Sequence, residues 1–428
     1  MRIIKSVTIE EFWGDKKVTL NFNDNINFLI GVNGSGKTTI INLIAASLNA
    51  DFSTLDKVQF SKIRIDFFSS PKIKNDNIFI EVHKKEKTDS PYPNIIFSIK
   101  LPGEIKPRTF KLNEIEEDLF FRYPNELRRQ RFHMSGQLNR DINNSLQSIV
   151  NLTWLSIHRT SKSHNNEEKS FESSIDQKVK ELSTELVKYF GVLDKKYSIE
   201  TEKFQKNVFL SLIEGEKAAG NLLKTDDLDS VREKESLKQI FLLFKLQESE
   251  FSAKLDKHYK GFDKAKKDFE EKSHIDLDML SYVLGTRRIH SIVQEWNDLN
   301  EKKNTINKPK LTFIEELNKL YQRKELFINE KNELNVRTES GKIFNLLNLS
   351  SGEKQLLIIL GESLLQENKF HIYIADEPEL SLHVDWQEKL VGSLKSVNAN
   401  SQIIFATHSP DIVGTHSNCV INVENFIK

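Results

Sequence analysis

Hydrophobic residues near both ends of the chain fall into short runs or alternate with polar residues, as is typical of strands. Strands are predicted for Ile3–Ile9, Val18–Phe22, Ile26–Ile30, Lys62–Phe68, Ile78–His83, Ile95–Leu101, Leu152–Ile157, Leu334–Arg337, Ile343–Leu347, His371–Ala375 and Gln402–Ala406. Helical spacing predicts helices over Thr38–Leu48, residues 113–150, the run after Gly352 and Val384–Val397. Helices that follow strands predict an α/β fold at both ends of the chain.

In the middle of the chain the hydrophobic residues change to helical spacing. The three stripes are Phe171, Ile175, Val179, Leu182, Leu186 and Phe190; Leu237, Phe241, Phe244, Phe251, Leu255 and Phe262; and Phe313, Leu317, Leu320, Phe327 and Leu334. Such stripes bury one face of a helix against another helix. We interpret the segment as a short antiparallel coiled coil with extra helices. An ordinary helical domain is the alternative, because Glu248 and His258 interrupt the second stripe.

The predicted organisation is an α/β head assembled from both chain ends around a large α-helical insertion. Residues 1–159 and 336–428 form the head, and residues 160–335 form the insertion. Each end carries only some of the sequence motifs described below. The two ends are therefore expected to share one sheet.

Composition narrows the class of protein. The chain has 428 residues, and its 62 Lys and Arg balance its 62 Asp and Glu, so a nucleic-acid site would have to be a local patch. A single cysteine, Cys419, excludes an intramolecular disulfide and fits a reducing cytoplasm. The longest apolar runs, Ile240–Phe244 and Leu356–Leu360, are too short to span a bilayer. We expect a cytoplasmic protein with no membrane segment.

The segment Gly31–Thr38 matches the phosphate-loop pattern G-x-x-x-x-G-K-[ST] at every position. Its glycines let backbone N–H groups point at phosphate oxygens, and the following helix adds its positive end. Lys37 is expected to reach the terminal phosphates of ATP, and the Thr38 hydroxyl to bind Mg²⁺. The expected ATP contacts in this segment are Asn33, Gly34, Ser35, Gly36, Lys37, Thr38 and Thr39.

The strand at His371–Ala375 delivers two adjacent carboxylates, Asp376 and Glu377, at its C-terminal end. Asp376 is expected to hold Mg²⁺ opposite Thr38, and Glu377 to polarise the attacking water. Such a pair alone is a weak signal, and it becomes specific because a complete phosphate loop is present.

A third motif, Leu-Ser-Ser-Gly-Glu, begins at Leu349 and opens a predicted helix. Here the chain resembles the ABC-type ATPases, whose signature loop reads Leu-Ser-Gly-Gly-Gln. Ser351 and Glu353 depart from that pattern, as in the DNA-repair and chromosome-maintenance branch. The resemblance implies that Ser350, Ser351 and Gly352 contact the γ-phosphate bound to another subunit, and hence a homodimer. A helix N-cap at Ser350 is a compatible structural role.

A fourth motif, Ala406–Pro410, follows the last predicted strand. It resembles the switch-histidine loop of the same family, which implies that His408 senses the γ-phosphate. The long insertion and the Asp-Glu-Pro-Glu-x-x-Leu-His form at Asp376–His383 resemble the overcoming-lysogenization-defect (OLD) group. Its relatives include ATPase subunits of the PARIS and Septu anti-phage systems. The resemblance covers roughly residues 1–50 and 340–415.

Two weaker signals concern arginines. Arg159 closes a predicted strand, and the OLD resemblance implies that it faces the nucleotide. Four more arginines lie among aromatic residues, where they suit either a nucleic-acid backbone or an exposed helix face: Arg122, Arg128, Arg129 and Arg131. The glutamine expected between the phosphate loop and the signature motif stays open among Gln59, Gln130 and Gln137.

The leading hypothesis is an ATP-hydrolysing sensor or scaffold that dimerises around ATP and controls a separate effector in anti-phage defence. OLD proteins continue into a Toprim nuclease, whereas this sequence ends soon after His408, so the expected effector is a separate nuclease. A higher oligomer and contact with DNA or a phage component fit the same hypothesis. The alternative is a DNA-repair or DNA-maintenance ATPase that clamps DNA directly. A transporter motor is disfavoured by the insertion and by the residues Leu380–His383.

Overall fold

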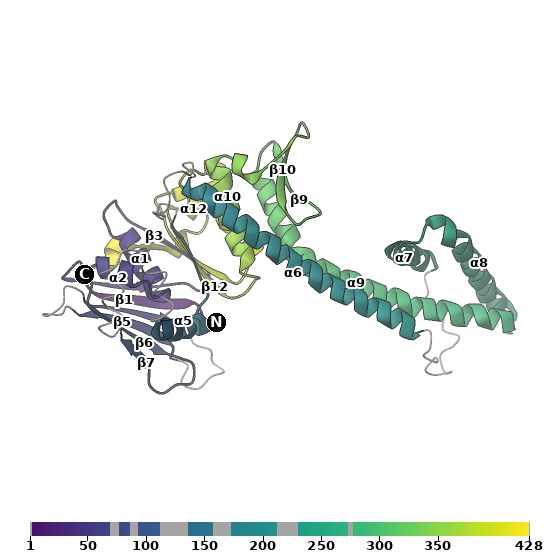
Figure 1. Ribbon diagram of the computed structural model, residues 1–428, viewed down its shortest axis with the longest axis horizontal. Helices are drawn as coiled ribbons and strands as arrows, with labels where there is room; N and C mark the ends of the chain where they lie inside the picture. The colour runs from purple at the N-terminus through teal and green to yellow at the C-terminus, as the bar shows by residue number, and fades with distance from the viewer. Residues whose placement is uncertain are drawn as a thin grey trace. The chain divides into compact units, whose positions relative to one another are not determined.

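A computed structural model describes residues 2–68, 77–85, 93–111, 136–156, 173–211, 230–272 and 277–427 (Figure 1). The chain divides into two compact units, which we call the head unit (residues 1–187 and 312–428) and the helical unit (residues 188–311). None of the described helices is both long enough and apolar enough to cross a membrane.

A five-stranded parallel sheet in the head unit combines both ends of the chain. Its strand order is β14-β3-β13-β12-β8. The strands are β3 (Ile26–Ile30), β8 (Leu152–Ser156), β12 (His371–Asp376), β13 (Ser401–Ala406) and β14 (Val420–Asn422). Because β3 lies between β13 and β14, neither end of the chain can complete this sheet alone. The prediction of an α/β head assembled from both chain ends is confirmed.

A six-stranded antiparallel sheet forms a second layer of the head unit, with the order β2-β1-β4-β5-β6-β7. Its strands are β1 (Ile4–Phe12), β2 (Lys16–Asn21), β4 (Lys62–Phe67), β5 (Phe79–Lys85), β6 (Asn94–Lys100) and β7 (Arg108–Lys111). Alternate residues such as Ile63, Ile65 and Phe67 are buried, which explains the alternation in the sequence. Every predicted strand over residues 1–101 is therefore confirmed.

The helix α1 (Lys37–Leu48) lies between the two sheets and contacts β4, β5, β8, β12 and β13. Its apolar residues join one hydrophobic core with residues of both sheets. The short helix α2 (Phe52–Lys57) packs against α1, and α5 (Gly136–Ile149) packs against β6. The buried position of α1 explains why its sequence is apolar on almost all sides.

Further elements of the head unit precede, contain or follow the signature motif in the sequence. They are the hairpin sheet β9 (Lys324–Ile328), β10 (Leu334–Thr338) and β11 (Ile343–Phe344), and the helices α10 (Ser351–Leu365), α11 (Val384–Val397) and α12 (Pro410–Val413). The helix α10 begins directly at the signature motif, and α11 packs against it.

The helical unit contains residues 188–211 of α6 (Ser174–Ser211) and 277–311 of α9 (Leu277–Leu320), with α7 (Ser230–Leu243) and α8 (Glu248–Lys272) between them in sequence. Within it α6 and α9 lie side by side (Figure 1), where the rings of Phe204 and Trp296 are 5.6 Å apart. A core of aromatic and aliphatic residues from all four helices holds this unit together.

Two of the three predicted helical stripes do not lie on a single continuous helix. The second stripe is broken because Lys245 adopts a left-handed backbone conformation (φ 61°) between α7 and α8, which fold back so that Phe241 and Phe251 meet at 5.0 Å. The third ends at Leu320, because Phe327 and Leu334 belong to the hairpin β9–β10. A spacing of seven residues fits either structure when a turn intervenes.

The boundaries predicted for the insertion, residues 160 and 335, remain a prediction. The compact helical unit is narrower, because residues 173–187 and 312–335 belong to the head unit. The arginine-rich segment and most of the helix predicted over 113–150 lie outside the described residues.

The fold makes Gln402 a testable link between the two sheets. Its buried side chain, on β13, accepts a hydrogen bond from Ile4 N and donates to Ile4 O, both at 2.7 Å. The variant Gln402→Leu would leave these buried backbone groups of β1 unpaired, at a cost of about 3 kcal/mol. We expect the thermal unfolding midpoint to fall by roughly 5–10 °C.

The matched control is Gln177→Leu, which replaces an exposed glutamine on α6 and should leave the midpoint unchanged. Equal midpoints for Gln402→Leu and the wild-type protein would show that this link does not hold the sheets together.

Candidate active site

The phosphate loop joins β3 to α1 in the way its sequence predicts. Gly34 and Gly36 have φ values of 85° and 92°, which side-chain-bearing residues rarely adopt. A Cβ atom on Gly36 would also lie 2.9 Å from the Trp13 ring. The hydroxyl oxygen of Ser35 is buried and lacks a hydrogen-bond partner in the described part of the chain, as expected of a group that awaits a ligand. Asn33 is exposed at the tip of the loop.

Lys37 folds back over the phosphate loop. Its Nζ atom donates hydrogen bonds to Gly31 O at 2.8 Å and Val32 O at 3.2 Å. Burial lowers the pKa of Lys37 below its ordinary value, while nearby carboxylates, first Glu377 and then Asp376, raise it. A partly desolvated ammonium group beside open backbone N–H groups is suited to phosphate oxygens.

Thr38 and Asp376 bring the two ends of the chain together. The Thr38 hydroxyl donates a hydrogen bond to Asp376 Oδ1 at 3.1 Å. A hydroxyl and a carboxylate at this distance fit Mg²⁺, which in nucleotide enzymes binds one or two protein oxygens together with substrate phosphates. Thr39 follows in the first turn of α1, next to these groups.

Glu377 lies at the C-terminal end of β12 in a left-handed backbone conformation, with φ 47°. Its N–H donates to Ala406 O at 2.8 Å, which fixes this conformation against β13. The Glu377 Oε1 atom is 4.0 Å from His408 Nε2, and both side chains are partly exposed. The two residues predicted to act on the γ-phosphate and the attacking water therefore lie together.

Glu379 was missed as a site residue, although it lies in the Asp-Glu-Pro-Glu motif. Its Oε1 atom accepts hydrogen bonds from the Thr407 hydroxyl at 2.7 Å and from His408 N at 2.9 Å. Its Oε2 atom is buried without a partner among the described residues. Glu379 thus fixes the backbone of the histidine loop, and the repeated carboxylate in the motif was the signal for it.

The signature motif forms the N-terminus of α10. Ser350 caps the helix: its hydroxyl accepts from Glu353 N, and its N–H donates to Glu353 Oε2 at 2.8 Å. Ser351 begins the helix and is exposed. A Cβ atom on Gly352 would lie 2.4 Å from Ser381 O, so the glycine is required by packing within the chain. The prediction that Ser350 is the N-cap of this helix is therefore confirmed.

Glu353, which stands where the ABC-type signature sequence has glutamine, is paired with a lysine of the same chain. Lys324 Nζ donates to both of its carboxylate oxygens at 2.8 Å. Burial raises the pKa of Glu353, but the hydrogen bonds from Lys324 and Ser350 outweigh this effect and leave the pKa below its ordinary value. The charge of Glu353 is balanced, so the end of α10 keeps its preference for anions.

Two further residues beside the phosphate loop were missed. Trp13 packs on Phe12, with ring centroids 4.5 Å apart, and remains 41% exposed next to Gly36. Glu424, in the single-turn helix η4 (Val423–Phe426), accepts a hydrogen bond from Val32 N at 2.7 Å. Both contacts are long-range in sequence, so no local pattern predicts them.

Three of the predicted positions cannot be placed. Arg159 and Gln130 lie outside the described residues, and so does the side chain of Gln137. Gln59 is described, and its backbone oxygen accepts a hydrogen bond from Trp13 N at 3.2 Å. The choice among the three glutamines stays open.

Comparison with known proteins assigns the family. The AAA ATPase domain family matches residues 1–413. The chain belongs to this family. The prediction that it is an ATPase, an enzyme that hydrolyses ATP, is thereby confirmed. The matched region includes all the predicted site residues, whereas Glu424 lies beyond it.

Two curated relatives are ATPases of retrons. The chain is 28% identical over 193 residues to the retron Vc95 probable ATPase of Vibrio cholerae serotype O1 biovar El Tor, covering 39% of the chain and 37% of the relative. It is 33% identical over 82 residues to the retron Ec83 probable ATPase of Escherichia coli, covering 17% and 15%. The chain thus spans 37% of the length of the first relative and 15% of the length of the second.

Similar solved structures include Smc head domains. One, with an extended coiled coil and bound to the C-terminal domain of ScpA, derives from Pyrococcus furiosus; it has a TM-score of 0.46 at 15% identity and covers 96% of this chain and 91% of that chain. Another, with a coiled coil and joint, derives from Pyrococcus yayanosii, with a TM-score of 0.39, 15% identity, and coverage of 96% and 93%. Because both TM-scores are below 0.5, the description of the fold rests on the strand order given above and not on these structures.

The contact between Glu424 and the phosphate loop can be tested by ATP affinity. In Glu424→Ala the N–H of Val32 loses its acceptor, and we expect the Kd for ATP to rise about fivefold, as for the loss of one exposed hydrogen bond. Glu424→Gln keeps an acceptor oxygen and should bind ATP nearly as well as the wild-type protein. Tighter ATP binding by Glu424→Ala would instead mean that the carboxylate competes with phosphate.

Proposed function

We propose that the chain binds ATP with Mg²⁺ at this site and works as a homodimer with two composite ATP sites. The observation that carries the proposal is the 3.1 Å contact between Thr38 and Asp376, which assembles the phosphate loop and the catalytic carboxylates from opposite ends of the chain. Lys37 would bind the terminal phosphates. Thr38 and Asp376 would exchange their mutual hydrogen bond for Mg²⁺ and its water shell.

Glu377 is the proposed general base that orients the attacking water. Its carboxylate is partly exposed and forms no salt bridge with a Lys or Arg side chain among the described residues; His408 Nε2 lies 4.0 Å away. The carboxylate is therefore accessible to a water molecule. His408 is the proposed sensor of the γ-phosphate, since the histidine loop is held by Glu379 at the same edge of the sheet. Phosphate binding would align both residues with the γ-phosphate.

Trp13 is the proposed platform for the adenine base. Its exposed indole lies beside Gly36, at the start of α1. When the phosphates of ATP are bound in the phosphate loop, the adenine base can extend toward Trp13 and stack on its ring. Stacking on an aromatic side chain contributes roughly 1–3 kcal/mol per base.

The second chain is proposed to complete each site with its signature loop. The N-terminus of α10 carries a positive partial charge, and the capped Ser350 and exposed Ser351 present hydrogen-bonding groups there. Lys324 removes the repulsion that Glu353 would otherwise exert on a phosphate. A two-fold axis would bring each signature loop to the γ-phosphate held by the other chain's Lys37. Arg159 is proposed as a further contact.

The biological role that we propose is control of a separate effector, a nuclease, in anti-phage defence. One support is the similarity to retron ATPases. The other is the motif at Asp376–His383, which resembles that of the OLD group and its PARIS-type and Septu-type relatives. The helical unit is the proposed site of partner or higher-order assembly, and the cytoplasm the proposed location. The alternative, an ATPase that clamps DNA directly, rests on the arginines between 122 and 131, outside the described residues.

The composite site predicts complementation between two inactive variants. Lys37→Ala and Ser350→Arg each damage both sites of a homodimer. In the mixed dimer one site carries both lesions and the other carries none. A statistical mixture should therefore regain about a quarter of the wild-type ATPase rate, since half of its dimers keep one of two sites.

Ser340→Arg is the control, because it adds the same side chain at an exposed turn between β10 and β11 and should stay active. A mixture as inactive as either parent, with heterodimers demonstrated, would contradict independently working shared sites.

A further inference from the structure

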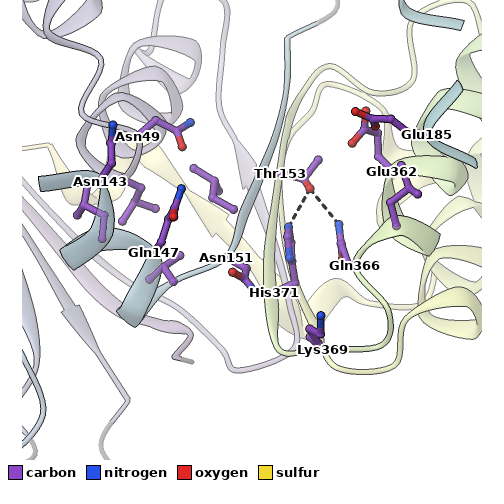
Figure 2. Close-up of a pocket in the computed structure, with 15 residues that line it drawn as sticks. Asn49, Asn143, Gln147, Asn151, Thr153, Glu185, Glu362, Gln366, Lys369 and His371 are labelled. Atoms are coloured by element: carbon purple, nitrogen blue, oxygen red, sulfur yellow. Dashed lines mark hydrogen bonds between the residues drawn. The ribbon is translucent and has the colours of Figure 1, made fainter. Parts of the chain in front are cut away.

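A cavity of about 600 Å³ lies in the head unit (Figure 2). None of its lining residues belongs to the phosphate loop. The cavity and the ATP site share one helix and one strand. The helix α1 begins at Lys37 in the ATP site and ends at Leu48 in the cavity, and β12 begins at His371 in the cavity and ends at Asp376 in the ATP site. The cavity is therefore separate from the nucleotide and lies at the opposite ends of the same helix and strand.

The lining combines an aliphatic surface with polar side chains. Leu48, Leu146 and Leu152 supply apolar area, and the amides of Asn49, Asn143 and Gln147 stand on one side of the cavity. An aliphatic chain can lie on the former, and amide groups can both donate and accept hydrogen bonds. A cavity of this size holds a small organic molecule.

Three helices end at the cavity. Its lining includes the last residue of α1 and the residues at the ends of α5 and α10: Leu48, Val150 and Leu365. Each helix C-terminus carries about half a negative charge. Together they favour a positively charged group, with the ends of α1 and α10 contributing more than that of α5, whose Ile149 oxygen already accepts a hydrogen bond from Arg2 N at 2.8 Å.

The charged side chains in and next to the lining have a net negative charge. Glu185 and Glu362 line the cavity, and Glu362 is paired with Lys178 at 2.6 Å. The one lysine of the lining, Lys369, is paired with Glu367 at 3.2 Å. These three carboxylates and two ammonium groups leave one negative charge, which adds to that of the helix ends.

His371 is an independent sign of a ligand. Its side chain is 8% exposed, and its Nδ1 atom is buried with no hydrogen-bond partner in the described part of the chain. On the other side of the ring, Nε2 is 2.8 Å from the Thr153 hydroxyl, which accepts from Gln366 Nε2 at 3.1 Å (Figure 2). The Thr153 hydrogen can therefore be donated to Nε2 of a neutral ring, which places the ring proton on Nδ1.

The neutral form of this ring is favoured by its surroundings. Burial lowers the pKa of His371 to about 4. A buried N–H donor without an acceptor is unfavourable, so a molecule in the cavity would be stabilised by an acceptor oxygen at this point.

We infer that the cavity binds a small molecule with an aliphatic chain, a cationic group and a carboxylate, the chemistry of a free basic amino acid. The cationic group is held by the three helix C-termini and Glu185. The carboxylate accepts the hydrogen bond from His371 Nδ1 and lies near Lys369. The inference does not depend on the proposed ATPase mechanism, because none of these residues belongs to the ATP site.

Binding of L-arginine to the purified full chain, measured by calorimetry without nucleotide, tests the inference. Two analogues separate its parts: citrulline lacks the cationic group, and agmatine lacks the carboxylate. We expect L-arginine to bind with a Kd below about 1 mM, citrulline at least tenfold more weakly, and agmatine more weakly than L-arginine. L-lysine should also bind, whereas inorganic phosphate should not bind.

Glu185→Gln removes one carboxylate at the exposed rim, and we expect it to weaken L-arginine binding several-fold. Glu181→Gln, one turn earlier on α6 and outside the cavity lining, is the matched control and should bind as the wild-type protein does. Lys37→Ala should also bind L-arginine normally, which distinguishes this cavity from the ATP site. Absence of binding, equal affinity for citrulline, or equal affinity of Glu185→Gln and wild type would overturn the inference.

Discussion

The interleaving of the two chain ends in one parallel sheet is the constraint on which the rest of the head depends. The strand β3 sits between β13 and β14, so the phosphate loop can form only against strands that lie more than 370 residues later in the sequence. The pairing of β13 with β12 then places Asp376 within 3.1 Å of Thr38. The positions of the phosphate loop and of the two adjacent carboxylates follow from this arrangement of strands.

The signature helix α10 is fastened to the segments of the head unit that flank the helical unit. Lys354 pairs with Asp176 of α6 at 2.6 Å, and a Cβ atom on Gly361 would lie 2.7 Å from Leu182. On the other side, the Tyr321 hydroxyl, just past α9, donates to Glu353 O at 2.8 Å. The backbone oxygen of Glu353 thus joins the signature motif to the segment that follows α9. Movement of either flanking segment would act directly on the loop proposed to meet the partner's ATP.

Sequence patterns predicted those parts of the head whose physics is local. The phosphate loop needs glycines with positive φ next to a strand and a helix, and alternation at Lys62–Phe67 reports a sheet with one buried face. Asp376 and Glu377 were recognisable because they end a buried strand.

Other features depend on contacts that no local pattern contains. Glu424 and Trp13 reach the phosphate loop only through the folded sheets, and Glu379 acts by binding the loop of another strand. The third helical stripe failed because a heptad spacing cannot distinguish a helix from a helix followed by a hairpin. Here the left-handed residues Arg323 and Asn332 flank β9. The cavity at His371 was likewise invisible, since three helix ends meet there from distant parts of the sequence.

The central claim, that groups from both chain ends form one hydrolytic site, is tested most directly by ATP turnover of Glu377→Gln. Turnover with Mg²⁺ is measured beside ATP affinity for this variant and the wild-type protein. The amide keeps the shape of the side chain but loses its basicity. We therefore expect unchanged ATP affinity and a turnover rate lower by about a hundredfold or more. Turnover at the wild-type rate, with ATP bound normally, would contradict it.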